Sequence, residues 1–192
     1  MRSLTLAFSG GVDSGKTTIS RGVAAHLSWR WASFGDYVRK QATERCLDAN
    51  DRRTLEDLGQ ELVHSSVDTF VSCFLSSIHW LPGTNLCLDG LRHLEVRNSI
   101  ARLTSPSRIA VVFLDAPFTL REDRLRKKGE TGDLLRIDDH PAERQTFSVL
   151  REQADLLLDS SGDSGVAVNA VLIWAKANFC PNPEPRSTVL PH

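Results

Sequence analysis

A glycine-rich segment near the N-terminus contains the residue types that bind the phosphates of a nucleotide. It reads Gly10-Gly11-Val12-Asp13-Ser14-Gly15-Lys16-Thr17 and matches Gly-x-x-x-x-Gly-Lys-Thr, the phosphate-binding loop. The apolar residues 4–8 precede it, and residues 18–27 have a helical pattern, so the segment has the strand–loop–helix context that the motif requires. These flanks disfavour a chance glycine-rich turn. The segment therefore predicts binding of a nucleoside triphosphate.

The residue types of this loop follow from its chemistry. Glycine lets the backbone curl so that its N–H groups surround the β-phosphate, and the next helix adds its positive N-terminal dipole. We expect Lys16 to reach the β- and γ-phosphates and the Thr17 hydroxyl to bind Mg²⁺. The predicted cofactor is Mg²⁺, with ATP as phosphoryl donor. The predicted ATP-binding residues are Gly10, Gly11, Val12, Asp13, Ser14, Gly15, Lys16, Thr17 and Thr18.

Two further segments place charged side chains directly after predicted strands. Asp36 and Arg39 follow residues 30–34, and Asp89 and Arg92 belong to Asp-Gly-Leu-Arg at the end of residues 86–89. Arg39 lies on the same helical face as Asp36 and could clamp a phosphate. Asp89 is placed to contact Mg²⁺ directly or through water. The alternatives are an Asp36 that caps its helix, a capped turn at Asp89, and arginines that are only solvated.

The elements that must position these residues alternate along the chain. Apolar runs predict strands at 4–8, 30–34, 86–89, 109–114 and 156–158, and helical spacing predicts helices at 18–27, 37–47, 52–77, 95–103, 120–128, 141–153 and 164–179. Residues 129–140 read as a polar loop. This order predicts an α/β, doubly wound P-loop NTPase fold with three layers: a five-stranded parallel sheet, helices on both faces and a short lid. Ligands bind beyond the carboxyl ends of such strands.

Composition and length limit the remaining choices. The 192 residues suit one domain, which we place at 1–180, with an acceptor-binding helical part at about 36–80 and a lid at about 121–144. The proline-rich residues 181–192 read as a disordered tail. A net charge of −1 gives no reason to expect nucleic acid, and no apolar run suits a membrane span. Four scattered cysteines and no signal-peptide pattern favour the cytoplasm.

Several blocks together carry a family resemblance. Ser-x-Gly-Asp-x-x-Arg at residues 33–39 resembles Ser-Thr-Gly-Asp-Met-Leu-Arg of adenylate and UMP/CMP kinases, and residues 89–92 resemble their Asp-Gly-Phe-Pro-Arg without its proline. Residues 128–132 and 136–140 resemble the UMP/CMP kinase lid. The Asp-Gly-x-Arg block, the arginine-rich helix and residues 154–159 also resemble dephospho-CoA kinases and their archaeal relatives. The resemblance to this P-loop nucleoside monophosphate kinase type spans about residues 4–161.

The resemblance implies roles for particular side chains. Arg39 and Arg92 would hold the phosphate of the acceptor, Arg124 would approach the donor nucleotide, and Arg136 would be a lid arginine that stabilises the transferring phosphoryl group. Arg121 and Arg126 are weaker candidates, and residues 121–128 could instead form a solvated helix with internal ion pairs. The catalytic residues so implied are Lys16, Asp36, Arg124 and Arg136. Asp36 would act as a general base only toward a hydroxyl acceptor.

The implied activity is ATP- and Mg²⁺-dependent phosphoryl transfer to a small nucleotide acceptor, with a nucleoside monophosphate as the first choice. One alternative is phosphorylation of a ribose hydroxyl, as in dephospho-CoA kinases. Another is a nucleotide-binding switch or regulatory ATPase that acts on a protein partner. A homodimer or a protein partner stays open. The chain departs from the family at Asp13, in the absence of zinc-binding cysteines in the lid, and in the second lid arginine, for which Arg144 and Arg151 are weak candidates.

Overall fold

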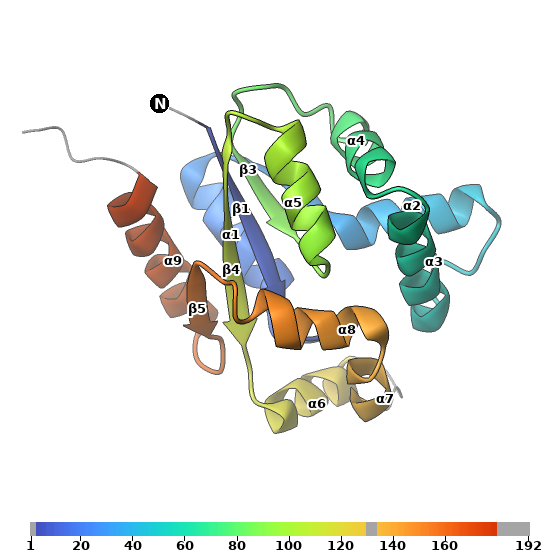
Figure 1. The fold of residues 1–192 in the computed structure, drawn as a ribbon. Coiled ribbons are helices and arrows are strands. Elements are labelled where there is room, and N and C mark those ends of the chain that lie inside the picture. The colour runs from blue at the N-terminus through green and yellow to red at the C-terminus, as the bar shows by residue number, and fades with distance from the viewer. Residues whose placement is uncertain (1–2, 130–133, 180–192) are drawn as a thin grey trace, which may run out of the picture.

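The fold is built on one parallel β-sheet. The computed structural model describes residues 3–129 and 134–179. Within them, five strands pair in the order β2-β3-β1-β4-β5, all parallel, which confirms the predicted fold class (Figure 1). The strands are β1 (Leu4–Gly10), β2 (Arg30–Ser33), β3 (Leu86–Asp89), β4 (Arg108–Asp115) and β5 (Leu156–Asp159).

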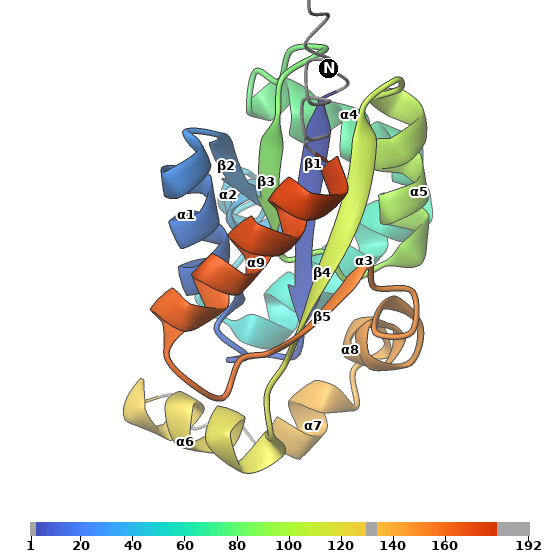
Figure 2. The same ribbon diagram turned by 90° about the vertical axis from the view of Figure 1, so that its left-hand side faces the viewer.

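Helices cover both faces of the sheet. On one face lie α1 (Lys16–Leu27) and α9 (Ser164–Phe179), and on the other lie α4 (Val67–Ser77), α5 (Leu94–Leu103) and α8 (Pro141–Gln145) (Figures 1 and 2). The helices α6 (Phe118–Lys127) and α7 (Leu134–Asp138) lie beyond the carboxyl ends of the strands. Two more, α2 (Phe34–Glu44) and α3 (Arg52–Ser65), extend to one side of the sheet.

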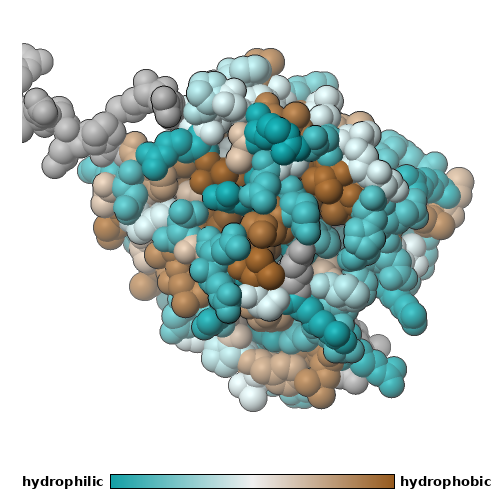
Figure 3. Space-filling view, viewed as in Figure 1, coloured by the Kyte–Doolittle hydropathy of each residue, from teal (hydrophilic) through white to brown (hydrophobic). Residues whose placement is uncertain are grey.

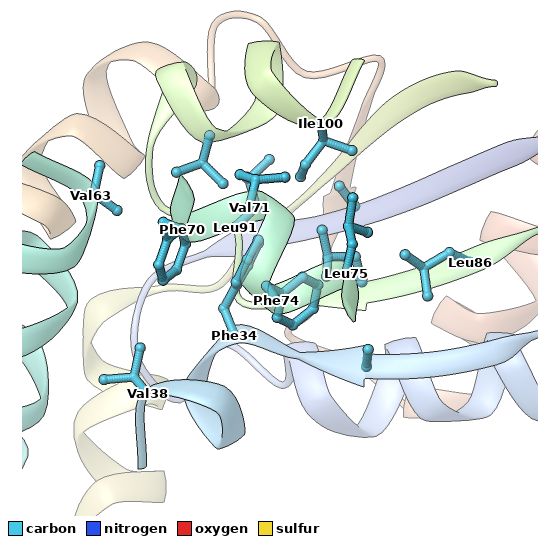
Figure 4. Packing of buried hydrophobic residues seen from close by; sticks show 14 of the residues in the cluster. Phe34, Val38, Val63, Phe70, Val71, Phe74, Leu75, Leu86, Leu91 and Ile100 are labelled. Carbon is cyan, nitrogen blue, oxygen red and sulfur yellow. The ribbon is translucent and has the colours of Figure 1, made fainter. Parts of the chain in front are cut away.

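The alternation of side chains along the strands divides the core in two. In β1, Leu6 and Phe8 pack with the α1 and α9 side, whereas Ala7 between them packs with the opposite side. On that opposite side, Phe34 of α2 lies beside Phe70 and Phe74 of α4, with ring centroids 5.3 and 4.3 Å from Phe34 (Figure 4). Both faces of the sheet are thus buried, as a parallel sheet requires.

The surface seen from the side of Figure 1 is mostly hydrophilic. Apolar residues on this face form small separate patches rather than one broad area (Figure 3). No helix within the described ranges has both the length and the apolar composition needed to cross a membrane.

The predicted single helix over residues 52–77 is wrong, because the structure has α3 and α4 with a break at Ser66. The backbone of Ser66 is extended, and its hydroxyl accepts a hydrogen bond from Thr69 N at 3.3 Å and donates to Thr69 Oγ1 at 2.9 Å. This is N-capping, which competes with helix continuation. The apolar spacing runs across both helices and therefore hides the break.

Other element boundaries also differ. The predicted second strand loses its last residue, because α2 begins at Phe34 with Ser33 as N-cap, whose hydroxyl accepts from Asp36 N at 3.2 Å. The predicted loop over 129–140 contains α7, and the predicted helix over 141–153 is α8 followed by a π-helix, Thr146–Leu150. Residues 130–133 of the predicted lid and the predicted tail at 181–192 lie outside the described residues. The division into a kinase domain and a tail stays a prediction.

Removing the cap at Ser66 should destabilise the protein. We expect Ser66→Ala to lower the free energy of unfolding by about 1 kcal/mol, because a backbone N–H of α4 loses its acceptor. Urea titration followed by circular dichroism measures this change. Ser65→Ala is the matched control, since the Ser65 hydroxyl only donates to the carbonyl of Glu61 within α3. Equal midpoints for the two variants would contradict the capping role.

Candidate active site

The phosphate loop follows the central strand β1 at the edge where all the strands end. Its backbone needs glycine at two places, Gly10 with φ of 133° and Gly15 with φ of 92°, because residues with a Cβ atom rarely adopt these conformations. A Cβ atom on Gly11 would lie 2.5 Å from both Arg121 Nη1 and Phe147 Cζ, so a larger residue there would displace these two side chains. At Gly10 and Gly15 the glycines of the motif thus permit the backbone conformation of the loop.

The remaining residues of the loop divide into a buried and an exposed group. Val12 is buried against Leu125 of α6 and against Leu134 and Ile137 of α7. Ser14 is also buried, and its backbone N–H donates to the Gly11 carbonyl at 3.2 Å. In contrast, Thr17 and Thr18 in the first turn of α1 have exposed side chains, which a nucleotide could contact.

Lys16 is held by the loop itself. Its Nζ donates to the carbonyl oxygens of Gly10 at 2.7 Å and of Gly11 at 2.6 Å. Burial lowers the pKa of Lys16 to about 8, although the carboxylates of Glu143, Asp89 and Asp13 act in the opposite direction. The ammonium group is thus largely desolvated before any phosphate arrives, which makes it a strong partner for an anion.

Thr17 and Asp89 form the candidate magnesium site. The Thr17 hydroxyl donates to Asp89 Oδ2 at 2.7 Å, because β3 pairs directly with β1 and brings Asp89 beside the loop. Asp89 is only 4% exposed, burial raises the pKa of its carboxyl group, and its Oδ1 has no hydrogen-bond partner among the described residues. A buried orphan carboxylate oxygen next to a hydroxyl fits Mg²⁺, which is bound through one or two carboxylates together with phosphates and waters.

This site is a partial one, as expected for a metal that arrives with a nucleotide. Over residues 3–129 and 134–179, no group of three or more His, Cys, Asp or Glu side chains is placed to hold a metal ion by itself. Mg²⁺ binding here would therefore depend on the phosphate oxygens of ATP.

Two arginines of α6 reach the phosphate loop. Arg121 is buried, its Nη1 donates to the Val12 carbonyl at 3.3 Å, and Asp138 of α7 binds the same guanidinium at 3.0 and 2.5 Å. Arg124 donates to the carbonyls of Asp13 at 3.1 Å and Ser160 at 3.0 Å. Arg121, one of the weaker candidates from the sequence, therefore lies as close to the loop as Arg124 does.

The other charged residues near the lid are placed differently. Arg126 forms ion pairs with Glu122 and Asp123 of its own helix, as the alternative of a solvated helix predicts for that residue. Arg136 is exposed on α7. The carboxylate of Asp13, which departs from the family pattern, contacts Lys128 Nζ just after α6. Asp13 thus joins the loop to the end of α6.

A cavity of about 400 Å³ lies between α2, α3 and the segment that follows β3. Arg39, Gly90 and Arg92 line this cavity, and Gly90 is the residue that follows Asp89 in the chain. Arg39 pairs with Asp36 at 3.2 Å, and both side chains are more than half exposed. The structure therefore brings both predicted acceptor arginines to one cavity next to the candidate magnesium site.

Arg92 does not extend freely over the crevice. Its Nη1 contacts Glu143 Oε1 of α8 and lies 4.0 Å from Glu56 Oε1 of α3. Glu143 is fully buried and also acts electrostatically on Lys16. Neither Glu143 nor Glu56 belongs to a sequence motif, so neither was predicted as a site residue.

Several solved structures with a similar fold are those of kinases. They include shikimate kinase from Acinetobacter baumannii in complex with shikimate, with a TM-score of 0.59 and 14% identity over 94% of this chain and 97% of that one. APS kinase CysC from Mycobacterium tuberculosis gives a TM-score of 0.58 at 16% identity over 91% and 98% of the two chains. A sugar kinase from Janibacter sp. gives 0.53 at 17% identity over 92% and 95%. At these identities the likeness establishes the P-loop NTPase fold alone.

Sequence relatives are found in archaea. No protein-family model matches the chain. A UPF0200 protein of Methanosarcina mazei is 26% identical over 152 residues, which cover 78% of this chain and 80% of that protein. A UPF0200 protein of Aeropyrum pernix is 30% identical over 135 residues, which cover 69% of this chain and 68% of that protein. On this similarity, the chain belongs to the UPF0200 protein family.

Proposed function

We propose that the protein is an ATP- and Mg²⁺-dependent kinase that transfers the γ-phosphoryl group to a small acceptor in the cavity between α2 and α3. The observation that supports this most is the adjacency of the two sites. Asp89 accepts the hydrogen bond of Thr17 on the phosphate-loop side, and the next residues, Gly90 and Arg92, line the cavity. A donor phosphate and an acceptor would therefore meet at the end of β3.

The chemistry asks for positioning and for neutralisation of charge. An acceptor oxygen would form a bond to the γ-phosphorus while the bond from that phosphorus to the β-bridging oxygen breaks. Lys16 would exchange its two backbone carbonyl partners for the β- and γ-phosphates, and Arg124 would approach them from α6. Mg²⁺, held by Thr17 and Asp89, would neutralise phosphate charge. Arg136 of α7 would complete the site from the lid.

A nucleoside monophosphate is the first candidate for the acceptor. The cavity volume of about 400 Å³ falls within the range of small-molecule sites. Arg39 and Arg92 line the same cavity as Gly90, the residue after Asp89, so an acceptor phosphate bound by these arginines would lie near the donor. Such a phosphate is already ionised at neutral pH, so no general base is needed.

A hydroxyl acceptor is the second candidate, as in dephospho-CoA kinases. Both arginines are already paired with carboxylates, Arg39 with Asp36 and Arg92 with Glu143. Neither arginine therefore needs an acceptor phosphate to balance its charge. Asp36 would then take the proton of the attacking hydroxyl. A switch or regulatory ATPase is favoured less, because such a protein has no need for a cavity with two arginines beside its magnesium site.

Incubation with ATP, Mg²⁺ and a panel of acceptors tests the proposal. The panel holds ribo- and deoxynucleoside monophosphates, nucleosides and dephospho-CoA, and the products are separated by chromatography. Conversion of one acceptor to its next phosphate supports the kinase. Absence of conversion throughout the panel, with ATP turned over only when a protein partner is added, would replace the kinase by the switch.

Two substitutions should separate the donor and acceptor functions. We expect Lys16→Ala to reduce kcat at least about 100-fold, because the transferring phosphate loses its charged donor. Arg39→Ala should instead raise the KM of the acceptor about tenfold or more, with the KM of ATP unchanged. Steady-state kinetics measure both. Arg53→Ala is the control, since Arg53 on α3 is highly exposed and pairs with Asp57. An acceptor KM that Arg39→Ala leaves unchanged would remove Arg39 from the site.

Binding of ATP should weaken at alkaline pH. Lys16 has a pKa of about 8 in the unliganded protein, and bound phosphates favour its charged form. Above this pKa, binding must take up a proton, so affinity should fall by up to about tenfold per pH unit. Titration calorimetry from about pH 7 to about pH 9.5 measures this dependence.

Glu143→Gln should move the fall in affinity to lower pH. The Glu143 carboxylate raises the pKa of Lys16, so its removal lowers that pKa further. Exchange of the half-exposed Glu122 for Gln, in α6, is the matched control for the loss of one carboxylate. An affinity that stays constant up to about pH 9.5, or a shift toward higher pH in Glu143→Gln, would contradict the assigned pKa and its cause.

A further inference from the structure

Two oxygen atoms on the α3 wall of the cavity lack partners. Glu56 and Gln60 are one helical turn apart and both line the cavity. Glu56 Oε1 and Gln60 Oε1 are buried and have no hydrogen-bond partner among the residues that the structure describes. The side chain of Glu56 is only 10% exposed, and burial raises the pKa of its carboxyl group. The Gln60 oxygen accepts hydrogen bonds and cannot donate them, and the same holds for Glu56 Oε1 when the carboxyl group is ionised.

Neighbouring groups do not satisfy these oxygens. Arg92 Nη1 lies 4.0 Å from Glu56 Oε1, which is too far for a hydrogen bond. The other end of the Gln60 amide is already engaged, because its Nε2 is bonded to His64 Nε2 at 3.0 Å. Leaving a buried acceptor unpaired is unfavourable, so a ligand that brings N–H groups to both positions would gain that free energy on binding.

Apolar and aromatic side chains form part of the remaining wall, next to the polar side chains of Asn50, Arg52 and His93. Val38, Val63 and Phe70 line the cavity from α2, α3 and α4, and Figure 4 shows these three among the packed side chains. A ligand that suits this wall has an apolar body with hydrogen-bond donors at one edge. A nucleobase with an exocyclic amine has this form. A base with a carbonyl oxygen at that place would face another acceptor and would be rejected.

We propose that Glu56 and Gln60 select an acceptor whose base carries an exocyclic amine, with the amine donating to their side-chain oxygens. Adenine, guanine and cytosine have such an amine, whereas uracil and hypoxanthine do not. The assignment rests on the proposed function in that it takes the cavity as the acceptor site. Ligand binding to the cavity can nevertheless be measured without any phosphoryl transfer.

Calorimetric titration with nucleoside monophosphates tests this assignment. The matched pairs are AMP with IMP, GMP with IMP, and CMP with UMP, which differ at the amine. We expect at least one amino-bearing member to bind about tenfold or more tightly than its counterpart, the loss typical of a missing hydrogen bond to a charged acceptor. Glu56→Gln and Gln60→Met should each reduce that ratio. Glu61→Gln, an exposed partner of Arg45 on the same helix, should leave it unchanged.

Thermal unfolding of the same variants separates recognition from a structural role. We expect Glu56→Gln to melt at the same temperature as the unchanged protein or higher, because a buried and incompletely paired carboxylate is removed. A structural role would lower the melting temperature together with affinity, and that result would overturn the assignment.

The selectivity of the cavity and the kinase activity can be rejected separately, because binding and transfer are measured in different experiments. Equal affinity within all three pairs, or no binding of any of the five nucleotides, would overturn the assignment of Glu56 and Gln60. Transfer from ATP to an acceptor without such preference would leave the proposed kinase standing and reject the selectivity. Selective binding without transfer would do the reverse.

Discussion

The positive charge of Lys16 is the constraint on which the site depends. The end of β1 and the start of α1 confine this ammonium between two backbone carbonyls, at 2.7 and 2.6 Å, where it is poorly hydrated. Asp89 and Glu143 act on it electrostatically from β3 and α8. The parallel sheet brings these elements together at one edge, so the fold itself assembles the charges. A nucleotide would enter a site whose donors are already oriented, which is the condition for efficient phosphoryl transfer.

Charge on the acceptor side is balanced in a similar way. Arg92 lies between the buried carboxylates of Glu143 and Glu56, and Arg39 is paired with Asp36. An acceptor that carries phosphate would have to compete with these carboxylates for the arginines. This competition means that an acceptor must offer more than phosphate, which is consistent with the unpaired oxygens on α3.

The sequence predicted the parts of the molecule that depend on local chemistry. The strand–loop–helix pattern around Lys16 located the phosphate loop, and the continuous apolar run at 109–114 indicated a strand buried on both faces. The predicted final helix, 164–179, has the observed boundaries. Charged residues at strand ends led to Asp89, Arg39 and Arg92, and the structure places all three around one crevice. In each case the signal lay within a few neighbouring residues.

The missed features depend on contacts between distant segments. Nothing in the residues around Glu143 indicates that α8 buries it against Arg92, 51 positions earlier in the chain. Arg121 looked like one charge among several on a basic helix until packing placed it on Gly11. The break at Ser66 was hidden because apolar residues continue through it. Periodicity reports which face of a helix is buried, whereas it does not report what that face meets.

The stoichiometry of ATP consumption tests the central claim most directly. The protein is incubated with Mg²⁺ and ATP labelled in the γ-phosphate, with and without each acceptor, and the amounts of ADP, labelled acceptor and inorganic phosphate are measured. The account predicts that one acceptor accelerates ADP formation and receives one labelled phosphate for each ADP formed. Release of the label as inorganic phosphate at the same rate with and without acceptors would contradict it.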